Sequence, residues 1–234
     1  MTTPQLNSAA RIEVRHFGAE NQPLVVIDDA LADPQTLVGA ALKTTFSAPP
    51  GGFYPGLNAP MQREYVSRLV AKLRPILAAN FGLPDEAVLD LSGYFGLATQ
   101  AASVLKPVQK IPHIDSTNPF QIALLHYVVS GQQGGTGFYR QDETGFESID
   151  AQRHATYTES YRLQLAEGGQ FLTRHVGAHT PGYTLIASVE AAFNRMILYR
   201  SNCLHSGLLE TSVLSNDPTT GRLTANVFVR PRST

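Results

Sequence analysis

Apolar residues follow two kinds of pattern along the chain. Short runs that are continuously apolar or β-branched, bounded by Gly, Asn or Pro, are typical of strands. They occupy residues 24–28, 94–97, 120–129, 183–189, 195–200 and 224–229. Five of these six runs come after residue 90, so the later part of the chain is predicted to be rich in β-structure.

Helical spacing of apolar residues occurs in three segments. The best of them, residues 61–81, repeats an apolar residue at every fourth position: Tyr65, Leu69, Leu73 and Leu77. Gly82 is a natural C-terminal cap, and Pro75 should kink or split the helix. Shorter helices are predicted at 33–43 and 151–165. The predicted elements follow one another as a strand, then helices, then many strands. This order favours helices packed on an antiparallel sandwich or barrel over an alternating parallel α/β sheet.

The composition provides enough apolar residues for a hydrophobic core and argues against several classes of partner. Hydrophobic residues make up 43% and charged residues 16% of the 234 positions. We expect one domain over 1–234, with a helical brace at about 30–82 and a β-rich core at about 91–230. The net charge of −1 predicts neither a nucleic-acid partner nor an anionic membrane surface.

The remaining exclusions concern disulfides and membranes. The single cysteine, Cys203, excludes an internal disulfide and a cysteine-based zinc site. No run of 18 apolar residues occurs, and residues 1–17 lack the apolar region of a secretory signal. These features predict a cytoplasmic protein.

The tripeptide His113–Ile114–Asp115 is the first candidate for chemistry. If it is extended, positions i and i+2 face the same side, so His113 and Asp115 could both reach one metal ion. The chain has seven histidines, and for the tripeptide alone a surface hydrogen bond between His113 and Asp115 is the favoured explanation. His205 follows a strand-like run and a polar turn, and it precedes a small Ser-Gly pair.

The third candidate opens the last apolar run. Arg222 and Thr224 are again at i and i+2 and share one face of a strand. A guanidinium and a hydroxyl aimed inward form a receptor for a carboxylate, and a buried arginine needs an anion. The alternative is that Arg222 is a surface residue beside a hairpin.

Together, His113-x-Asp115, the distant His205 and Arg222-x-Thr224 resemble the motif set of the Fe(II)/2-oxoglutarate-dependent dioxygenases, in their prolyl-hydroxylase-like branch. The resemblance spans about residues 24–229 and includes uncharacterised bacterial members. It implies a mainly β fold with N-terminal helices, built on a distorted jelly roll (a double-stranded β-helix of the cupin kind).

The resemblance also implies a set of ligands and roles. Fe(II) would be held by His113, Asp115 and His205, which form a facial triad with three open positions. The co-substrate 2-oxoglutarate would bind the metal through its keto oxygen and C1 carboxylate, and Arg222 would hold its far carboxylate with help from Thr224. With O2 as oxidant, the products would be succinate, carbon dioxide and a hydroxylated substrate.

Other residues carry weaker expectations. Tyr127 could donate to 2-oxoglutarate or be a core tyrosine, and Tyr94 could line the pocket. Residues 134–140 resemble the family's Gly-Gly turn into a barrel strand, which could point Tyr139 or Arg140 toward substrate, although a solvated Arg140 is favoured. His175 and His179 have helical metal-pair spacing, but the neighbouring Gly and Pro favour a loop. Residues 131–181 are predicted to be a lid around the helix at 151–165, the alternative being a surface insertion.

The expected function is therefore a hydroxylase acting on a small molecule or a peptide. The alternative is a cupin-like protein that binds a metal or small molecule without catalysis, and a third interpretation is a metal enzyme of the same fold without a co-substrate. Oxygen-dependent conversion of 2-oxoglutarate to succinate would separate the first from the other two.

Overall fold

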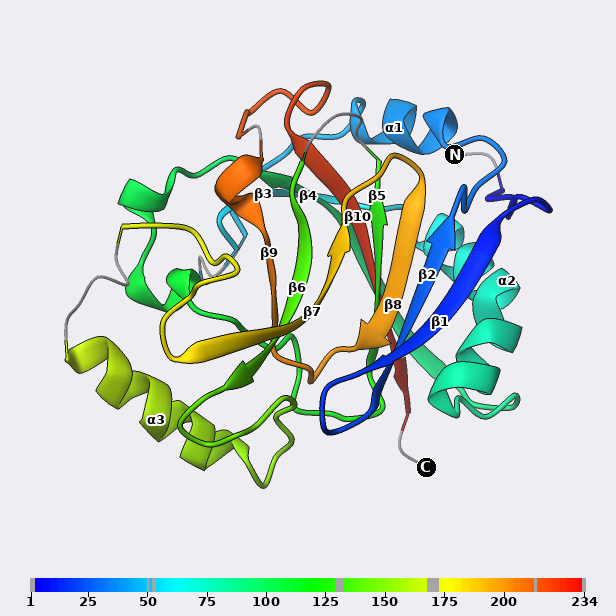
Figure 1. Cartoon of the computed structure of the whole chain (residues 1–234). Coiled ribbons are helices and arrows are strands. Elements are labelled where there is room, and N and C mark those ends of the chain that lie inside the picture. The colour runs from blue at the N-terminus through cyan, green and yellow to red at the C-terminus, as the bar shows by residue number, and fades with distance from the viewer. Residues whose placement is uncertain are drawn as a thin grey trace.

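The computed structural model describes residues 3–49, 51, 54–128, 133–167, 173–212 and 214–232. Its strands form two antiparallel sheets (Figure 1). The large sheet has the order β1-β2-β8-β5-β10-β4-β3. Its members are β1 (Arg11–Phe17), β2 (Gln22–Asp28), β3 (Gly56–Pro60), β4 (Leu89–Ala98), β5 (Ile122–Tyr127), β8 (Arg195–Arg200) and β10 (Arg222–Pro231). The small sheet has the order β7-β6-β9 and consists of β6 (Gly135–Gln141), β7 (Tyr183–Glu190) and β9 (His205–Gly207).

Helix α2 (Arg63–Phe81) packs on the outer face of the large sheet, where the apolar stripe predicted a helix. Leu73 and Leu77 are fully buried there. Gly82 ends the helix in the left-handed conformation (φ +69°), which costs glycine little. The helix continues through Pro75, so the prediction of a split was wrong. Pro75 lies on the exposed side, where water can reach the carbonyl that its ring leaves without a partner.

Two shorter helices complete the described structure. Helix α1 (Gln35–Ala41) lies before β3 and contributes Leu37 and Ala41 to the same core as α2. Helix α3 (His154–Ala166) lies on the opposite side of the molecule, beside the small sheet (Figure 1). Short 3-10 helices span Ala102–Val104, Pro107–Lys110 and Leu209–Thr211. Helices α2 and α3 therefore cover different sheets: α2 covers the large sheet and α3 the small one.

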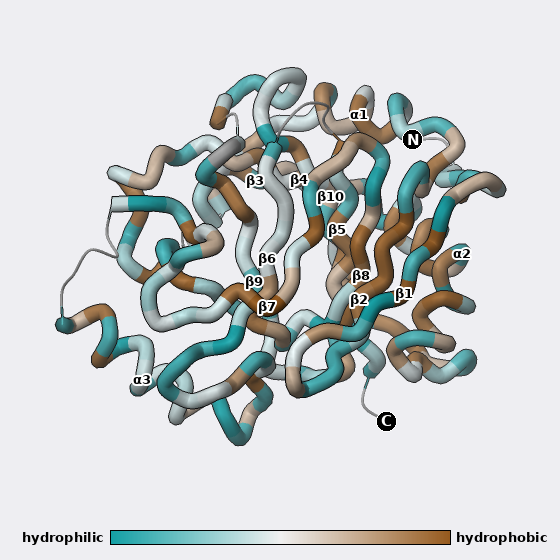
Figure 2. The backbone as a smooth tube through the Cα atoms, in the orientation of Figure 1, coloured by the Kyte–Doolittle hydropathy of each residue, from teal (hydrophilic) through white to brown (hydrophobic). Residues whose placement is uncertain are grey.

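A second core fills the space between the two sheets. Strand β2 shows why: Val25 and Ile27 face α2, whereas Leu24 and Val26 face the small sheet, so both faces are buried. This explains its continuous apolar run, which is visible as a hydrophobic band along β2 and β8 in Figure 2. Phe138 of β6 packs against this face of the large sheet and is fully buried.

The sequence patterns missed several strands. Strand β1 is an edge strand with six of its seven residues exposed. Ile12 and Val14 alternate there with charged residues, but this short alternation is not one of the apolar runs on which the strand predictions rest. Strand β6 begins Gly-Thr-Gly, and glycine is unfavourable in strands. The predicted strand at 120–129 is shorter in the structure: Phe120 is 65% exposed, β5 ends at Tyr127, and Val129 lies outside the described residues.

The lid prediction for residues 131–181 was wrong in its main element. The segment contains β6, the central strand of the small sheet, and α3 packs on the outer face of that sheet through Tyr157. The Tyr157 hydroxyl donates to the Pro112 carbonyl at 2.9 Å. Within this segment, residues 131–132 and 168–172 lie outside the described part of the chain.

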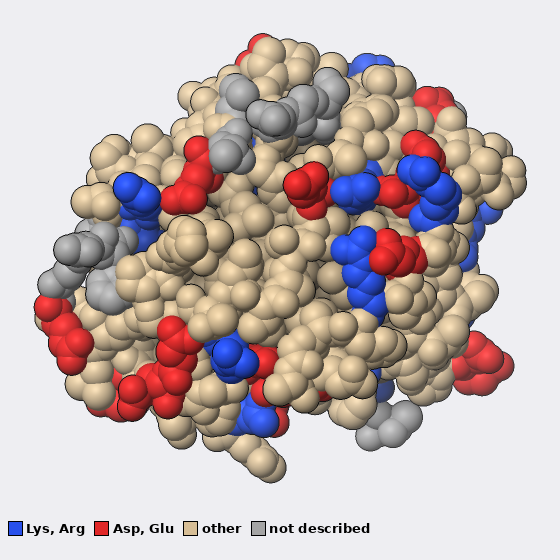
Figure 3. All heavy atoms as spheres, viewed as in Figure 1, with Lys and Arg blue, Asp and Glu red and all other residues tan. Residues whose placement is uncertain are grey.

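The surface of the described residues carries mixed charge. On the face shown in Figure 3, Lys and Arg lie beside Asp and Glu, and acidic residues gather where α3 lies. Among the described helices, none has both the length and the apolar character needed to cross a bilayer.

Candidate functional site

His113 and His205 lie opposite each other in an antiparallel backbone bridge. Each backbone N–H donates to the other residue's carbonyl at 2.9 Å. His205 opens β9, and His113 follows the 3-10 helix at Pro107–Lys110. Directly paired residues present their side chains on one face, and the two imidazole rings are 4.5 Å apart between centroids. The backbone therefore brings these two distant histidines together.

Asp115 completes a cluster with the two histidines. Its backbone N–H donates to the Ser201 carbonyl at 2.9 Å, which fixes the segment beside the turn that precedes His205. Its carboxylate oxygens lie 3.9 Å from His113 Nε2 and 3.5 Å from His205 Nε2. Within the described residues, this is the one group of three or more potential ligands, and its ligand atoms lie within 4.8 Å of one another.

Hydrogen bonding and burial set the protonation states of the cluster. His205 Nδ1 lies 2.9 Å from the Cys203 carbonyl, which can only accept, so Nδ1 carries the proton and Nε2 presents its lone pair toward Asp115. Burial lowers the pKa of His205 to about 4. Desolvation of the ring also lowers the pKa of His113, and the neighbouring His205 lowers it further. The His113 side chain is 54% exposed.

Desolvation acts in the opposite direction on Asp115 and raises its pKa to about 6, while His113 opposes that rise. At neutral pH the cluster therefore holds two neutral imidazoles and a carboxylate, which are the forms that bind a divalent metal.

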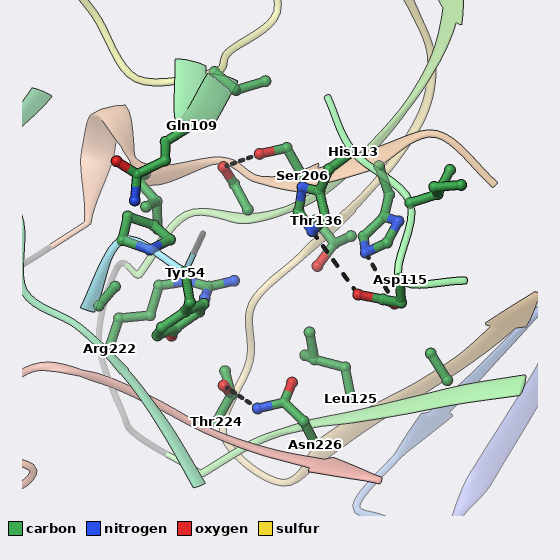
Figure 4. A pocket seen from close by; sticks show the side chains of 18 of the residues that line it. Tyr54, Gln109, His113, Asp115, Leu125, Thr136, Ser206, Arg222, Thr224 and Asn226 are labelled. Atoms are coloured by element: carbon green, nitrogen blue, oxygen red, sulfur yellow. Dashed lines mark hydrogen bonds and ion pairs between the residues drawn. The ribbon is translucent and has the colours of Figure 1, made fainter. Parts of the chain in front are cut away.

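A cavity of about 390 Å³ contains the cluster on one side and Arg222 on the other (Figure 4). Arg222 is 4% exposed. Its Nε donates to the Gln133 carbonyl at 3.0 Å and its Nη2 to the Gly135 carbonyl at 2.9 Å. Among the described residues, no carboxylate lies within ion-pair distance of this guanidinium, and no other Lys or Arg lines this cavity. The cavity therefore holds a buried positive charge that is not ion-paired with any acidic side chain the structure describes.

Three polar side chains surround the space next to Arg222. Asn226 donates to Thr224 Oγ1 at 3.0 Å, and Thr224 makes a long contact of 3.4 Å to the Gly96 carbonyl. Tyr54 lies close to both, and its buried hydroxyl has no hydrogen bond among the described residues; burial raises its pKa. Gly96 makes this approach possible, because a Cβ there would lie 2.9 Å from the Tyr54 hydroxyl and 3.2 Å from Thr224 Oγ1.

Tyr127 lies behind Arg222 and does not line the cavity. The guanidinium carbon lies 5.6 Å from the centre of the Tyr127 ring, and the tyrosine hydroxyl is 2.6 Å from Thr136 Oγ1. Tyr127 is 1% exposed. Its side chain therefore supports Arg222 and Thr136, both of which line the cavity.

The weaker sequence candidates fall in different places. Tyr94 lines the cavity, as expected. Tyr139 is fully buried with its hydroxyl on the Gly177 carbonyl, and Arg140 lies near Glu147 at 3.8 Å, so neither faces the cavity. His175 lines the cavity from an irregular segment, whereas His179 lines a separate one.

Sequence reasoning missed several residues of this cavity. Asn226 and Phe228 continue the alternation that begins with Arg222 and Thr224 on β10, so their facing could have been read from the strand pattern. Tyr54 gives no such signal, because it comes from a loop rich in Pro and Gly that precedes β3. Gln109 enters from a 3-10 helix and likewise has no pattern of its own.

A known protein family matches nearly the whole chain. Residues 8–229 match the model of a family described as a family of unknown function (DUF6445). The protein belongs to the DUF6445 family. No protein with a curated description matches this DUF6445 chain.

Two solved structures illustrate its structural similarities. HygX from Streptomyces hygroscopicus, with nickel, 2-oxoglutarate and hygromycin B bound, is 13% identical, with a TM-score of 0.49 over 91% of this chain and 84% of the other. An N-substituted L-amino acid dioxygenase from Burkholderia ambifaria AMMD is 12% identical, with a TM-score of 0.41 over 94% of each chain. Because these sequence identities and TM-scores are low, a function for this chain has to be inferred from the geometry of the site itself.

Proposed function

We propose that this DUF6445 protein is an Fe(II)- and 2-oxoglutarate-dependent oxygenase that hydroxylates a small molecule. One observation carries the proposal: a single cavity holds a His-Asp-His cluster and, across from it, a buried arginine that has no acidic partner within the described part of the chain. A bound metal and a dicarboxylate would satisfy both features at once. A protein that only bound a metal would have no need of the buried charge of Arg222.

The donor set of the cluster fits a ferrous ion. Metal–ligand bonds of about 2 Å place neighbouring ligand atoms about 3 Å apart, which the separations of 3.5 and 3.9 Å approach. Two imidazole nitrogens and one carboxylate oxygen form the facial triad of non-haem iron oxygenases. In this role His113, Asp115 and His205 would hold Fe(II), which when bound supplies the activation of O2 coupled to decarboxylation of 2-oxoglutarate.

The other side of the cavity fits the far carboxylate of 2-oxoglutarate. Arg222 keeps N–H groups beyond the two that bond to the Gln133 and Gly135 carbonyls. The hydroxyls of Thr224 and Tyr54 border the same space. In the low dielectric of this cavity, a charge-assisted pair with Arg222 would fix the co-substrate in one orientation, with its keto acid end toward the His-Asp-His cluster.

The protein's own residues then have distinct tasks. The hydrogen bond from His205 Nδ1 to the Cys203 carbonyl keeps the ring oriented with Nε2 toward the metal position. Tyr127 supports Arg222 from behind. Asp115 supplies a third protein ligand, which leaves no extra position for a halide. We therefore propose oxygen insertion, and a chlorinated product in the presence of chloride would contradict this assignment.

Binding and turnover together test the proposal. Calorimetric titration with 2-oxoglutarate under anoxia, in the presence of Zn²⁺ as an inert metal, should give saturable binding that disappears without the metal. With Fe(II), O2 and ascorbate, which supplies the electrons that reduce the second oxygen atom to water when no substrate is present, the protein should convert 2-oxoglutarate to succinate and carbon dioxide. Absence of binding at millimolar 2-oxoglutarate would overturn the oxygenase assignment. Binding without any succinate would instead favour a non-catalytic binding protein.

A further inference from the structure

A second cavity adjoins the first at the candidate metal position. It measures about 550 Å³, is more open, and shares Tyr94, Asp115 and Phe228 with the first cavity. Its other lining residues are Asp90, Leu91, Ser92, Gln121 and Arg230. Asp115 therefore borders both spaces, and a molecule in the second cavity would reach the metal from the side away from Arg222.

Strand alternation explains how the two cavities connect. Every second side chain of β10 lines one cavity or the other: Arg222, Thr224, Asn226, Phe228 and Arg230. On the neighbouring strand, Asp90, Ser92 and Tyr94 pair in register with Arg230, Phe228 and Asn226. The two strands thus form one continuous floor, and at about 3.3 Å per residue the eight steps from Arg222 to Arg230 span about 26 Å. That length accommodates a co-substrate and a second small molecule end to end.

The two ends of this floor differ in character. Arg222 is buried at the closed end, whereas the Arg230 side chain is 52% exposed at the open end. Between them, the Tyr94 and Phe228 rings lie 6.0 Å apart between centroids and form an apolar wall next to Asp115. Ser92 and Gln121 add hydrogen-bonding groups farther out.

The open end carries an excess of positive charge. Asp90 accepts from Arg230 Nη2 at 2.9 Å and from Arg232 Nε at 2.6 Å. One carboxylate shared by two guanidinium groups leaves a net charge of +1 on this cluster of three side chains. Of the two arginines only Arg230 lines the cavity, at the end away from Asp115, and it has N–H donors beyond the one that bonds to Asp90. Such an arrangement favours an anionic group on an incoming molecule.

We infer that the second cavity is the subsite for the oxidised substrate, and that this substrate is a small carboxylic acid. Its apolar part lies against Tyr94 and Phe228, beside the metal position, and its carboxylate points to Arg230. The inference rests on the proposed function, because that function assigns the first cavity to 2-oxoglutarate.

A matched pair of probes tests the assignment directly. Protein loaded with Zn²⁺ and 2-oxoglutarate is titrated with 3-phenylpropionate and with its amide, 3-phenylpropionamide, and binding is followed by saturation-transfer NMR. The two probes share their apolar part and differ in charge. We expect millimolar or tighter binding of the acid and about tenfold weaker binding of the amide. Equal affinity for the two probes, or no binding of the acid, would overturn the carboxylic acid assignment.

Variants locate the probe within the cavity. Arg230→Gln should weaken the acid about tenfold and leave the amide unchanged. Ser92→Phe, which fills the cavity beside Phe228, should abolish binding of both probes. Arg68→Gln, on the remote helix α2, is the matched control and should bind both probes as the unmodified protein does. Unchanged acid binding in both Arg230→Gln and Ser92→Phe would place the substrate elsewhere.

The same samples separate this inference from the proposed function. Binding of 2-oxoglutarate to the Zn²⁺-loaded protein is measured first for every variant, and it should be unaltered in Arg230→Gln and Ser92→Phe. If 2-oxoglutarate does not bind the unmodified protein, the proposed function fails. If it binds but the acid and amide probes behave alike, the proposed function stands and only the substrate class is wrong.

Discussion

Arg222→Ala should remove most of the affinity for 2-oxoglutarate while leaving metal binding nearly intact. Arg222 is 4% exposed, and no carboxylate among the described residues pairs with it, so the co-substrate would be its sole anionic partner. Removing one partner of a buried charge pair costs about 2–5 kcal/mol, which corresponds to roughly 30- to several-thousand-fold in affinity. Metal binding should persist because the His-Asp-His cluster lies across the cavity (Figure 4).

A second variant separates charge from geometry. Arg222→Lys keeps a positive charge but loses the planar fork that can bind a carboxylate bidentately, so its loss should be smaller, about tenfold. Arg222→Ala also removes the donors to the Gln133 and Gly135 carbonyls. Thermal melting of both variants is therefore measured alongside, because a loss of fold would mimic a loss of binding.

The assay is anoxic calorimetric titration of the Zn²⁺-loaded protein with 2-oxoglutarate. Equal affinity of the unmodified protein and Arg222→Ala would refute the reasoning. Neither Arg195 nor Arg200 could serve as the anchor instead: Arg195 is paired with Asp28, Arg200 bonds to the Pro119 and Phe81 carbonyls, and neither lines the cavity.

Three further predictions address the metal, the cavity wall and the core. His205→Ala should lower the affinity for Ni²⁺ at least tenfold in a direct titration, whereas His179→Ala, outside this cavity, should not. Gly96→Ala should weaken 2-oxoglutarate binding because its Cβ would lie 2.9 Å from the Tyr54 hydroxyl; Gly39→Ala, with open space around it, is the control and should bind normally. Burial lowers the pKa of His126 from 6.5 to about 4, so the unfolded chain takes up a proton first as pH falls. The free energy of unfolding should therefore drop between about pH 6.5 and pH 4, by about 3 kcal/mol from this residue. In His126→Gln, the free energy of unfolding from urea denaturation should depend less steeply on pH in that range, and an unchanged slope would contradict the prediction.

The sequence predicted best those features that depend on local spacing. The apolar repeat of α2, the buried runs of β2 and β8, and the common face of Arg222 and Thr224 all follow from the periods of helix and strand. The proximity of His113, Asp115 and His205 was a prediction of the resemblance, and the three side chains do lie together. Their role as metal ligands stays a prediction.

The features that sequence reasoning missed depend on contacts between distant segments. Strand β1 has almost no buried residues, and its place is set by backbone pairing with β2. The lid was placed over the cavity because nothing local shows that Tyr157 of α3 would pack behind the small sheet. Tyr54 reaches the cavity from a loop, and its position depends on the space that Gly96 leaves. Such placements are tertiary, and single-sequence patterns do not encode them.

The mutual backbone bridge between His113 and His205 has a consequence for how the protein would acquire and exchange a metal. In small domains that fold only around their ion, the metal draws its ligands together, and a chelator unfolds the chain. Here two ligands are already held side by side by a pair of main-chain hydrogen bonds, so little conformational entropy is left to lose on loading. Chelation should therefore leave a folded apoprotein that reloads without refolding, and which divalent ion occupies the centre would follow from mass action among the available ions.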